Sequence, residues 1–152
     1  MQTDTQEEEA LITVVQTLEP TLDYGGELSK RIAGYAARYD LAIFDVIQRA
    51  TESMYDGGSW EMRILSNGAW YINWITDIER VPLVNPANYT HKQASPEAAS
   101  IAVNLVVQNQ IIWHAHGNNK EKTQTLVTEY FYALREAAAQ HDEATAIFAF
   151  ID

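Results

Sequence analysis

The sequence predicts an α+β fold, in which a small three-stranded antiparallel sheet, a meander, packs against about five helices. Helical periodicity occupies both ends of the chain, alternating apolar residues are confined to its middle, and strands do not alternate with helices as in parallel sheets. We expect the helices to form a single layer on one main face of the sheet. The 152 residues are expected to form one domain, residues 1–152, with residues 1–6 frayed.

The first third of the chain is predicted to hold three helices. A short helix is expected over Glu7–Leu18, followed by a loop at Tyr24–Gly26. Apolar residues at helical spacing then predict helices over Glu27–Tyr39 and Leu41–Met54. Asp40 is placed to cap the second of these.

A hairpin follows the third helix. Gly57 and Gly58 break the helix because glycine adopts the backbone conformations needed for a reversal at little cost. Asn67-Gly68 predicts a two-residue type I′ turn at the hairpin tip. This tip pairs Ile64 with Tyr71.

The predicted register gives the hairpin two different faces, because side chains alternate along a strand. The apolar face, expected to meet the helices, carries Trp60, Met62, Ile64, Tyr71 and Ile75. The mixed face, expected to be partly covered or to make contacts, carries Glu61, Arg63, Leu65, Trp70, Ile72 and Trp74. Glu79–Val84 is predicted to be the third strand, with Pro82 placing it at an edge.

Two long helices and a short one are predicted to complete the chain. Ser95 is a capping residue and Pro96 suits the first helical position, so a helix should run from there to about Ala115. A second apolar stripe predicts a helix over Lys120–Gln140. Residues 141–152 should add one to two helical turns.

The net charge of −11 argues against direct binding of DNA, since nucleic-acid binders usually carry a basic stripe. An acidic decoy that imitates DNA is the alternative that this charge raises. One turn of duplex carries about 20 phosphates, whereas the 21 carboxylate side chains here are spread over the whole chain among ten lysines and arginines. We interpret the charge as a solubility feature that can also steer a basic partner.

No window approaches the roughly 20 apolar residues that a membrane helix needs, and the acidic start of the chain lacks the basic region of a secretory signal. The absence of cysteine excludes disulfides, thiolate nucleophiles and cysteine-ligated zinc. We therefore expect a cytoplasmic protein that makes no contact with a membrane.

Residues able to carry chemistry are present, but their spacing predicts no reactive site. His114 and His116 point about 200° apart on a helix and cannot chelate one ion, and no spacing joins His91 to them. Gly57-Gly58 follows a helix and precedes a strand, the reverse of a phosphate-binding loop. No Gly-x-Ser-x-Gly elbow occurs. We expect no metal, no cofactor and no enzymatic activity.

The chain contains Tyr55-Asp56-Gly57-Gly58-Ser59-Trp60 and, a little further on, Leu65-Ser66-Asn67-Gly68-Ala69-Trp70-Tyr71. These segments resemble the signature of the ArdB/KlcA family of plasmid-borne antirestriction proteins. Members of that family carry Tyr-Asp-Gly-Gly-aromatic-Trp followed by Leu-Ser-Asn-Gly-Gly-Phe-Tyr. The resemblance covers about residues 36–152, and the first third of the chain departs most from the family pattern.

The resemblance implies a mixed helix–sheet domain and a non-enzymatic protein that relieves type I restriction of incoming mobile DNA. It also implies that the matching residues are structural, namely Tyr55, Asp56, Gly57, Gly58, Trp60, Leu65, Ser66, Asn67, Gly68 and Tyr71. The expected partner is a component of a type I restriction complex or a host factor linked to it. The alternatives left open are the acidic DNA-mimic decoy and an accessory protein-binding domain of unknown partner.

We predict the contact surface on the mixed face of the hairpin. Trp, Tyr and Arg dominate the binding energy of protein interfaces, so Trp70 and Trp74 are expected to be exposed anchors, with Arg63 orienting the partner. Replacing both tryptophans with alanine would then abolish restriction relief in a protein that still folds. Asp152 is a second candidate, because the C-terminal ending matches the family pattern. An exposed indole face is also compatible with a homodimer.

Overall fold

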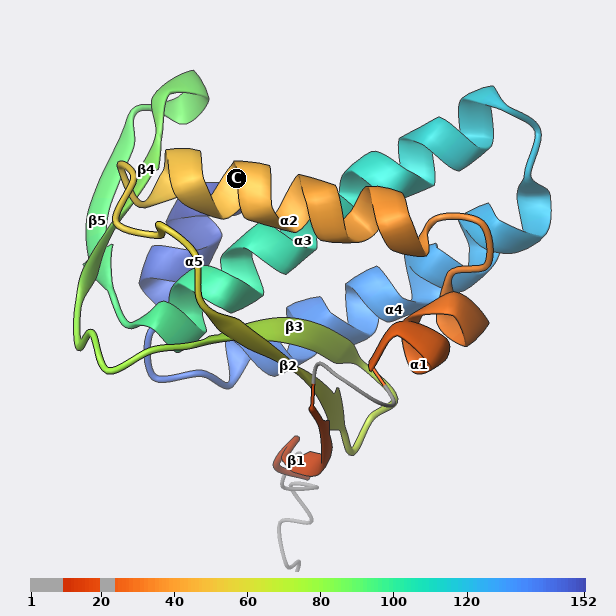
Figure 1. Cartoon of the computed structure of the whole chain (residues 1–152), viewed down its shortest axis with the longest axis horizontal. Helices are drawn as coiled ribbons and strands as arrows, with labels where there is room; N and C mark the ends of the chain where they lie inside the picture. Colours follow the sequence, from red (N-terminus) through yellow and green to blue (C-terminus); the bar gives the residue numbers. More distant parts are fainter. Residues whose placement is uncertain (1–9, 20–23) are drawn as a thin grey trace, which may run out of the picture.

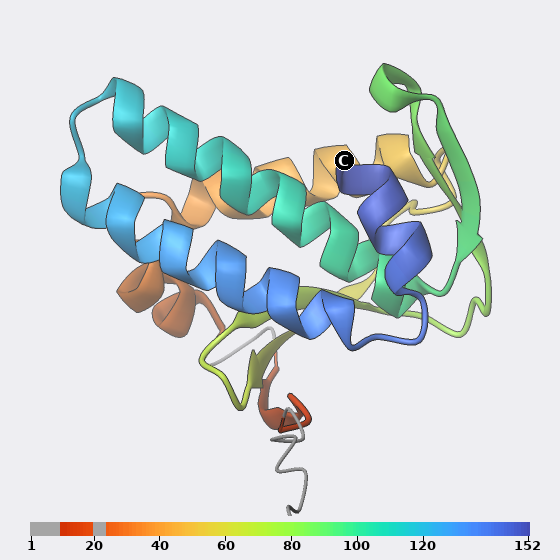
Figure 2. The same cartoon turned by 180° about the vertical axis from the view of Figure 1, so that it is seen from behind.

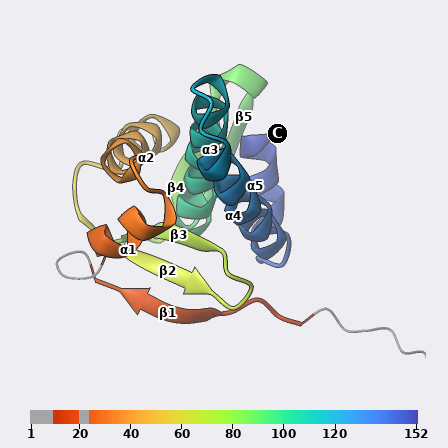
Figure 3. The ribbon, with the colours of Figure 1, turned by 90° about the vertical axis from the view of Figure 1, so that its right-hand side faces the viewer.

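The structure, a computed structural model, describes residues 10–19 and 24–152, so the expected fraying of residues 1–6 lies outside the described residues. In chain order the elements are β1 (Val14–Leu18), α1 (Tyr24–Arg31), α2 (Ala36–Ala50), β2 (Ser59–Leu65), β3 (Trp70–Ile75), β4 (Val81–Asn85), η1 (Pro86–Asn88), β5 (Thr90–Ala94), α3 (Pro96–Gly117), α4 (Glu121–Ala139) and α5 (Ala144–Ile151) (Figure 1). The predicted α+β class, with a three-stranded antiparallel sheet, is confirmed. Helices α2 to α5 lie on one side of that sheet (Figure 3).

The first described element is a strand, so the helix predicted over Glu7–Leu18 is wrong in its described part. β1 pairs antiparallel with β2, with Leu18 opposite Met62 and a bulge at Val15. The β-branched residues at positions 12–15 favour an extended backbone. Leu18 also buries its side chain on the core side of the sheet. Pairing with β2 therefore outweighs the helix formers of the segment.

The sheet has the strand order β1–β2–β3, so its third strand is β1 and not Glu79–Val84 as predicted. Most of that segment lies in β4, which pairs with β5 in a separate two-stranded sheet, with Val81 opposite Ala94. Pro82 lies on a strand with a free edge, as predicted, because a two-stranded ribbon leaves each strand one unpaired side.

The β2–β3 hairpin forms where predicted, but its loop has three residues, Ser66–Gly68. The N–H of Leu65 donates to the carbonyl oxygen of Ala69 at 2.8 Å, and the N–H of Gly68 donates to that of Leu65 at 3.0 Å. Within the loop only Gly68 has a positive φ, +87°. A type I′ turn at Asn67-Gly68 needs two such residues, whereas a three-residue loop needs one.

The longer loop shifts β3 by one residue against β2. Ile64 lies opposite Trp70 and Trp60 lies opposite Trp74, whereas the prediction places Ile64 opposite Tyr71. Such a slip turns every side chain of the strand to the other face. The apolar face therefore carries Trp60, Met62, Ile64, Trp70, Ile72 and Trp74, and the polar face carries Glu61, Arg63, Tyr71, Asn73 and Ile75.

The two N-terminal helices are displaced from their predicted bounds. α1 begins at Tyr24, inside the expected loop. α2 runs from Ala36 to Ala50 and contains Asp40, while Tyr35 occupies the N-cap position, so the predicted cap is wrong. The break between the helices contains Gly34 with φ +82°, a conformation that glycine adopts without steric cost.

The three C-terminal helices lie close to their predicted bounds. Oγ of Ser95 accepts the N–H of Ala98 at 3.1 Å, and Pro96 occupies the first position of α3. α3 and α4 lie side by side, and α5 packs beside the start of α3 (Figure 2). With α2 on its other side, α3 is buried over most of its surface. Among the described residues, no helix combines the length and hydropathy needed to cross a membrane.

A buried polar stripe on α3 holds the free edge of β3. Ser100, Asn104 and Gln108 follow one another at a spacing of four and are fully buried. The N–H of Trp74 donates to Oγ of Ser100 at 3.0 Å, and Nε2 of Gln108 donates to the carbonyl oxygen of Trp70 at 3.2 Å. The stripe fixes the register between helix and sheet.

Asn104 is the centre of this stripe. Its Oδ1 accepts the N–H of Ile72 at 2.9 Å and the hydroxyl of Tyr39 at 2.6 Å. Its Nδ2 donates to the carbonyl oxygens of Ile72 at 2.8 Å and Ser100 at 2.7 Å. The buried amide is thus fully hydrogen-bonded, as a polar group in a core must be.

Candidate functional site

The segment that enters the hairpin builds an aromatic cluster between α2 and the sheet. The hydroxyl of Tyr55 accepts the indole N–H of Trp60 at 3.0 Å. The ring of Tyr55 meets the ring of Trp74 edge-on, with 5.3 Å between centroids, and stacks on Phe44 at 6.1 Å. Packing of these rings ties α2 and the segment that follows it to both strands of the hairpin.

The two glycines of this segment are required by the backbone, and Gly58 also by close packing. Gly57 and Gly58 have φ of +116° and +150°, a backbone region that other residues rarely adopt. A Cβ on Gly58 would lie 3.3 Å from Nε1 of Trp74. Asp56, next to them, is exposed.

The hairpin tip is held from two sides. The side-chain amide of Asn67 accepts the N–H of Ala69 at 3.1 Å and donates to the carbonyl oxygen of Ala133 on α4 at 2.8 Å. Ser66 and Thr13 exchange two hydrogen bonds, through Oγ and N–H of Ser66, at 3.0 and 2.8 Å. Leu65 is buried at the base of the loop.

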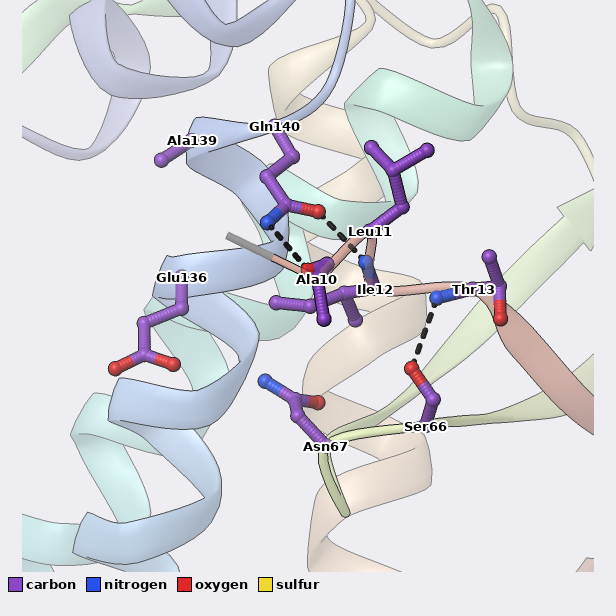
Figure 4. A pocket seen from close by; sticks show the side chains of 9 residues that line it. All are labelled: Ala10, Leu11, Ile12, Thr13, Ser66, Asn67, Glu136, Ala139 and Gln140. Atoms are coloured by element: carbon purple, nitrogen blue, oxygen red, sulfur yellow. Dashed lines mark hydrogen bonds between the residues drawn. The ribbon is translucent and has the colours of Figure 1, made fainter. Parts of the chain in front are cut away.

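A pocket of about 620 Å³ lies beside the tip, between residues 10–13 and the end of α4 (Figure 4). The amide of Gln140 accepts the N–H of Ile12 at 2.7 Å and donates to the carbonyl oxygen of Ala10 at 3.2 Å. Glu136 is the one charged side chain among the described lining residues. The pocket therefore joins the N-terminal segment to the body and gathers no set of reactive groups.

The prediction that Trp70 and Trp74 are exposed anchors is wrong. Their side chains are 0% and 4% exposed, because the actual register turns them to the apolar face. The indole of Trp70 packs against the rings of Tyr39 and Tyr130, with centroids 5.2 and 5.7 Å away. The argument for a homodimer through an exposed indole face therefore loses its basis.

Arg63 instead organises the polar face of the hairpin. Its Nε lies 2.6 Å from Oε2 of Glu61, and one terminal nitrogen lies 2.7 Å from Oε2 of Glu97 on α3. The same nitrogen donates to the hydroxyl of Tyr71 at 3.1 Å. Two carboxylates thus hold the guanidinium in place, and it joins the sheet to the start of α3.

The network continues from Glu97 to the turn before α5. Nε2 of His141 lies 2.7 Å from Oε1 of Glu97, and Nδ1 of His141 accepts the N–H of Glu143 at 2.9 Å. Glu143 accepts hydrogen bonds from the backbone N–H of Ser95 at 2.9 Å and from its hydroxyl, and from Arg80 at 2.8 Å. These contacts connect the start of α3 and the start of α5 to the β2–β3 hairpin.

The pKa values in this network follow from its pairing. The hydrogen bond with His141, together with Arg63, lowers the pKa of Glu97 from 4.5 to about 2. The same contact with the Glu97 carboxylate raises the pKa of His141. Burial raises the pKa of Tyr71 to about 12. Burial opposes the charged form of Glu143, but bonds from Ser95 and Arg80 outweigh it and lower its pKa.

This pairing predicts an acid-sensitive fold. Because the pKa of Glu97 is depressed, its carboxylate contributes stability above pH 4.5, its ordinary pKa, and this contribution is lost as the pH falls towards about 2. In urea unfolding, Glu97→Gln should be about 1 kcal/mol less stable than the wild type near neutral pH, since Glu97 is partly exposed.

The difference in unfolding free energy between Glu97→Gln and the wild type should shrink as the pH falls below 4.5 towards about 2. Glu129→Gln, at an exposed position on α4, is the matched control and should follow the wild type at every pH. A Glu97→Gln protein that loses stability with acid as steeply as the wild type would contradict the assignment.

Asp152 is exposed at the end of α5 and does not join the Arg63 network. Its Oδ1 lies 3.5 Å from a guanidinium nitrogen of Arg135 on α4. That guanidinium lies over the ring of Phe148, with its central carbon 5.0 Å from the ring centroid. The two predicted contact points, Arg63 and Asp152, thus belong to separate groups of contacts.

The sequence analysis missed two sets of polar residues, of which one has a signal in the sequence and the other has none. The stripe Ser100, Asn104 and Gln108 has a visible signal, since three polar residues recur at every fourth position and the residues between them are apolar. The pair Glu97 and His141 has none, because 44 residues separate its members. In the described part of the chain no three His, Asp or Glu side chains gather as a metal site would need.

Comparison with known proteins gives one consistent result. The profile of a protein family described as "Antirestriction protein" matches residues 53–152. The chain is 37% identical to the uncharacterized protein YafX of Escherichia coli K12 over 112 residues, 72% of this chain and 68% of YafX. It is 30% identical to the putative antirestriction protein YubI of the same strain over 103 residues, 64% of this chain and 68% of YubI.

The fold is also similar to a solved structure from work on the KlcA and ArdB proteins, with a TM-score of 0.76 over 100% of both chains and 24% identity. Those proteins are described as having a novel fold and antirestriction activity against type I DNA restriction systems in vivo but not in vitro. At this identity the likeness establishes a shared fold.

Proposed function

Because this chain belongs to the antirestriction protein family, to which ArdB and KlcA also belong, we propose that it relieves type I restriction of incoming mobile DNA in the host cell. The observation that carries the proposal is the family match over residues 53–152, which includes the hairpin and all three C-terminal helices. The activity described for KlcA and ArdB is the specific basis for naming type I systems.

The proposed mechanism is binding, without bond-making chemistry. Side chains that could act as acid, base or nucleophile are engaged in structural contacts: the hydroxyl and the backbone N–H of Ser95 donate to the carboxylate of Glu143, and Nδ1 of His141 accepts the backbone N–H of Glu143. Their contacts position α3 and α5. The partner we propose is a component of the restriction complex or a host factor linked to it. KlcA and ArdB are described as having antirestriction activity in vivo but not in vitro. Because a host factor is present in the cell, this contrast favours the host factor as the partner.

We propose that the partner contacts the polar face of the hairpin, where Arg63 and Glu61 border the start of α3. This surface combines charged groups with the exposed apolar side chain of Ile75, 44% exposed, as interfaces commonly do. Asp152 remains a second candidate contact.

An acidic decoy for DNA is the alternative that the net charge of −11 favours. A decoy needs regular rows of unpaired negative charge in place of phosphates. Here cations interrupt the carboxylates: a guanidinium nitrogen of Arg49 lies 2.7 Å from Oδ2 of Asp45, and one of Arg80 lies 2.8 Å from Oε1 of Glu143. Binding to a protein is therefore the better-supported mechanism.

A plating assay tests the function. Cells with a type I restriction system are challenged with unmodified phage, with and without this gene, and cells lacking the restriction system provide the control. We expect the gene to raise the efficiency of plating only in restricting cells. Unchanged plating in cells that accumulate the folded protein would refute the proposal. Inhibition of purified restriction enzyme that weakens as salt rises would favour the decoy instead.

A further inference from the structure

A groove of about 460 Å³ lies where α3 and α4 meet the end of α5 (Figure 2). Residues three and four positions apart share one face of a helix, and α3 and α4 each present such a set to the groove. The lining residues used below are Val106, Asn109 and Gln110 on α3, Phe131 and Arg135 on α4, and Ile151 on α5.

Three of these side chains are apolar and remain partly exposed. Val106, Phe131 and Ile151 pack against the core but are only half-buried, so each keeps surface in contact with water. They come from three different helices. An apolar group placed among them would remove all three from water at once, which favours its binding.

Arg135 is the one charged group among the described lining residues, and its side chain is 37% exposed. A guanidinium nitrogen of Arg135 lies 3.5 Å from Oδ1 of Asp152. A charge-assisted hydrogen bond is typically about 2.7 to 2.9 Å long, and Arg63 lies 2.6 and 2.7 Å from its two carboxylates. Asp152 therefore holds Arg135 loosely, and the five N–H donors of the guanidinium have room for a second carboxylate.

The side-chain amides of Asn109 and Gln110 complete the polar part of the groove. Both side chains are exposed, and neither forms a hydrogen bond with another described residue. Each amide has an acceptor oxygen and two N–H donors, as needed to pair with both groups of a peptide bond. A ligand that carries peptide groups thus suits this groove better than a hydrocarbon does.

We propose that the groove binds a segment of a partner protein in which an apolar side chain lies next to a carboxylate. The apolar side chain packs among Val106, Phe131 and Ile151, the carboxylate pairs with Arg135, and the peptide groups bond to the two amides. The inference rests on the proposed function for the identity of the partner, and it gives the chemistry of a second contact surface, separate from the polar face of the hairpin.

The net charge of the chain makes this proposal selective. At −11 the protein repels anions in general, so a carboxylate gains affinity only where a cation is locally available. The other occupants that the groove could take are a small carboxylic acid without peptide groups and a second copy of this chain. Both are outcomes of the tests below.

The first test is an NMR titration of the ¹⁵N-labelled chain with N-acetyl-phenylalanine, which combines an aromatic ring, a carboxylate and one peptide group. We expect the side-chain signals of Asn109, Gln110 and Arg135 to shift, and the amide signal of Asn67 at the hairpin tip to stay. The neutral N-acetyl-phenylalaninamide and the ringless N-acetyl-glycine should bind about tenfold more weakly. Equal binding of the neutral amide would overturn the proposal.

Two further measurements address the other occupants. 3-Phenylpropanoate has the ring and the carboxylate but no peptide group, so it should bind more weakly than N-acetyl-phenylalanine; equal binding would indicate a small acid and overturn the assignment to a protein segment. Analytical ultracentrifugation should show the same oligomeric state for the wild type and Arg135→Gln. A dimer that this substitution dissociates would make a second copy the occupant.

Variants separate Arg135 from the other cations of the chain. Arg135→Gln should weaken binding of N-acetyl-phenylalanine about tenfold and leave the fold intact, because the side chain is partly exposed. Arg49→Gln, the same change at an exposed arginine of α2, is the matched control and should bind as the wild type. Asp152→Asn should bind more tightly, since it removes the carboxylate that competes for Arg135. Equal binding by Arg135→Gln and Arg49→Gln would refute the site.

The plating assay distinguishes failure of this inference from failure of the proposed function. Relief by the wild type and by Arg49→Gln, with loss of relief in a folded Arg135→Gln protein, supports both. Full relief by an Arg135→Gln protein that no longer binds N-acetyl-phenylalanine would refute the groove as the partner contact and leave the function standing. No relief by a wild type that binds N-acetyl-phenylalanine would refute the function alone.

Discussion

Replacing Asn104 with leucine is expected to lower the free energy of unfolding by about 3 to 5 kcal/mol. The substitution deprives the N–H and the carbonyl oxygen of Ile72 of their partners, together with the hydroxyl of Tyr39. Each buried polar group left without a partner costs about 1 to 3 kcal/mol. Urea unfolding followed by circular dichroism measures the loss.

Asn109→Leu is the matched control for this prediction. It makes the same chemical change on the same helix at an exposed position, where substitutions usually change stability by about 0.5 kcal/mol or less. If Asn104→Leu were as stable as Asn109→Leu, the buried amide would not be what fixes β3 against α3.

Trp70→Ala is expected to destabilise the protein by about 3 to 5 kcal/mol, because it empties a fully buried site in the core. The indole fills the space between the ring of Tyr39 on α2 and the ring of Tyr130 on α4. Its removal opens a cavity that joins three elements. The measurement is again the free energy of unfolding in urea.

Trp113→Ala provides the comparison, since this indole on α3 is 62% exposed and should cost less than about 1 kcal/mol. Equal effects at the two positions would argue against the register of β3.

Trp70 and Trp74 are consequently poor sites for a functional test, because lost restriction relief in an alanine double mutant would report unfolding. Substitution of an exposed residue on the polar face, such as Ile75→Ser, probes contact with less risk to the core.

One glycine accounts for much of the difference between the predicted and the observed hairpin. The sequence signals at Ser95, Pro96 and the Asn67-Gly68 pair locate the helix start and the hairpin tip correctly. They do not distinguish a two-residue loop from a three-residue loop, since both place glycine in a left-handed conformation. The choice decides which face holds Trp70, and so it decides the candidate contact surface.

The misassigned N-terminal strand has a different cause. Residues 12–15 combine β-branched side chains with neighbours that favour helix, and local propensity is balanced between the two states. Only the open edge of β2, supplied by residues far along the chain, makes the strand the better choice. The same reason hides the contact between Glu97 and His141, because a tertiary contact leaves no periodic pattern in the sequence.

The bulge at Val15 also affects how the molecule behaves among its own copies. β1 is an outer strand, and Val14 and Val15 are 45% and 62% exposed, a combination that invites sheet growth from one molecule to the next. The bulge breaks the even spacing of backbone groups along that strand. A neighbouring chain cannot match this spacing with a straight strand, so the irregular edge protects the protein against aggregation at high concentration.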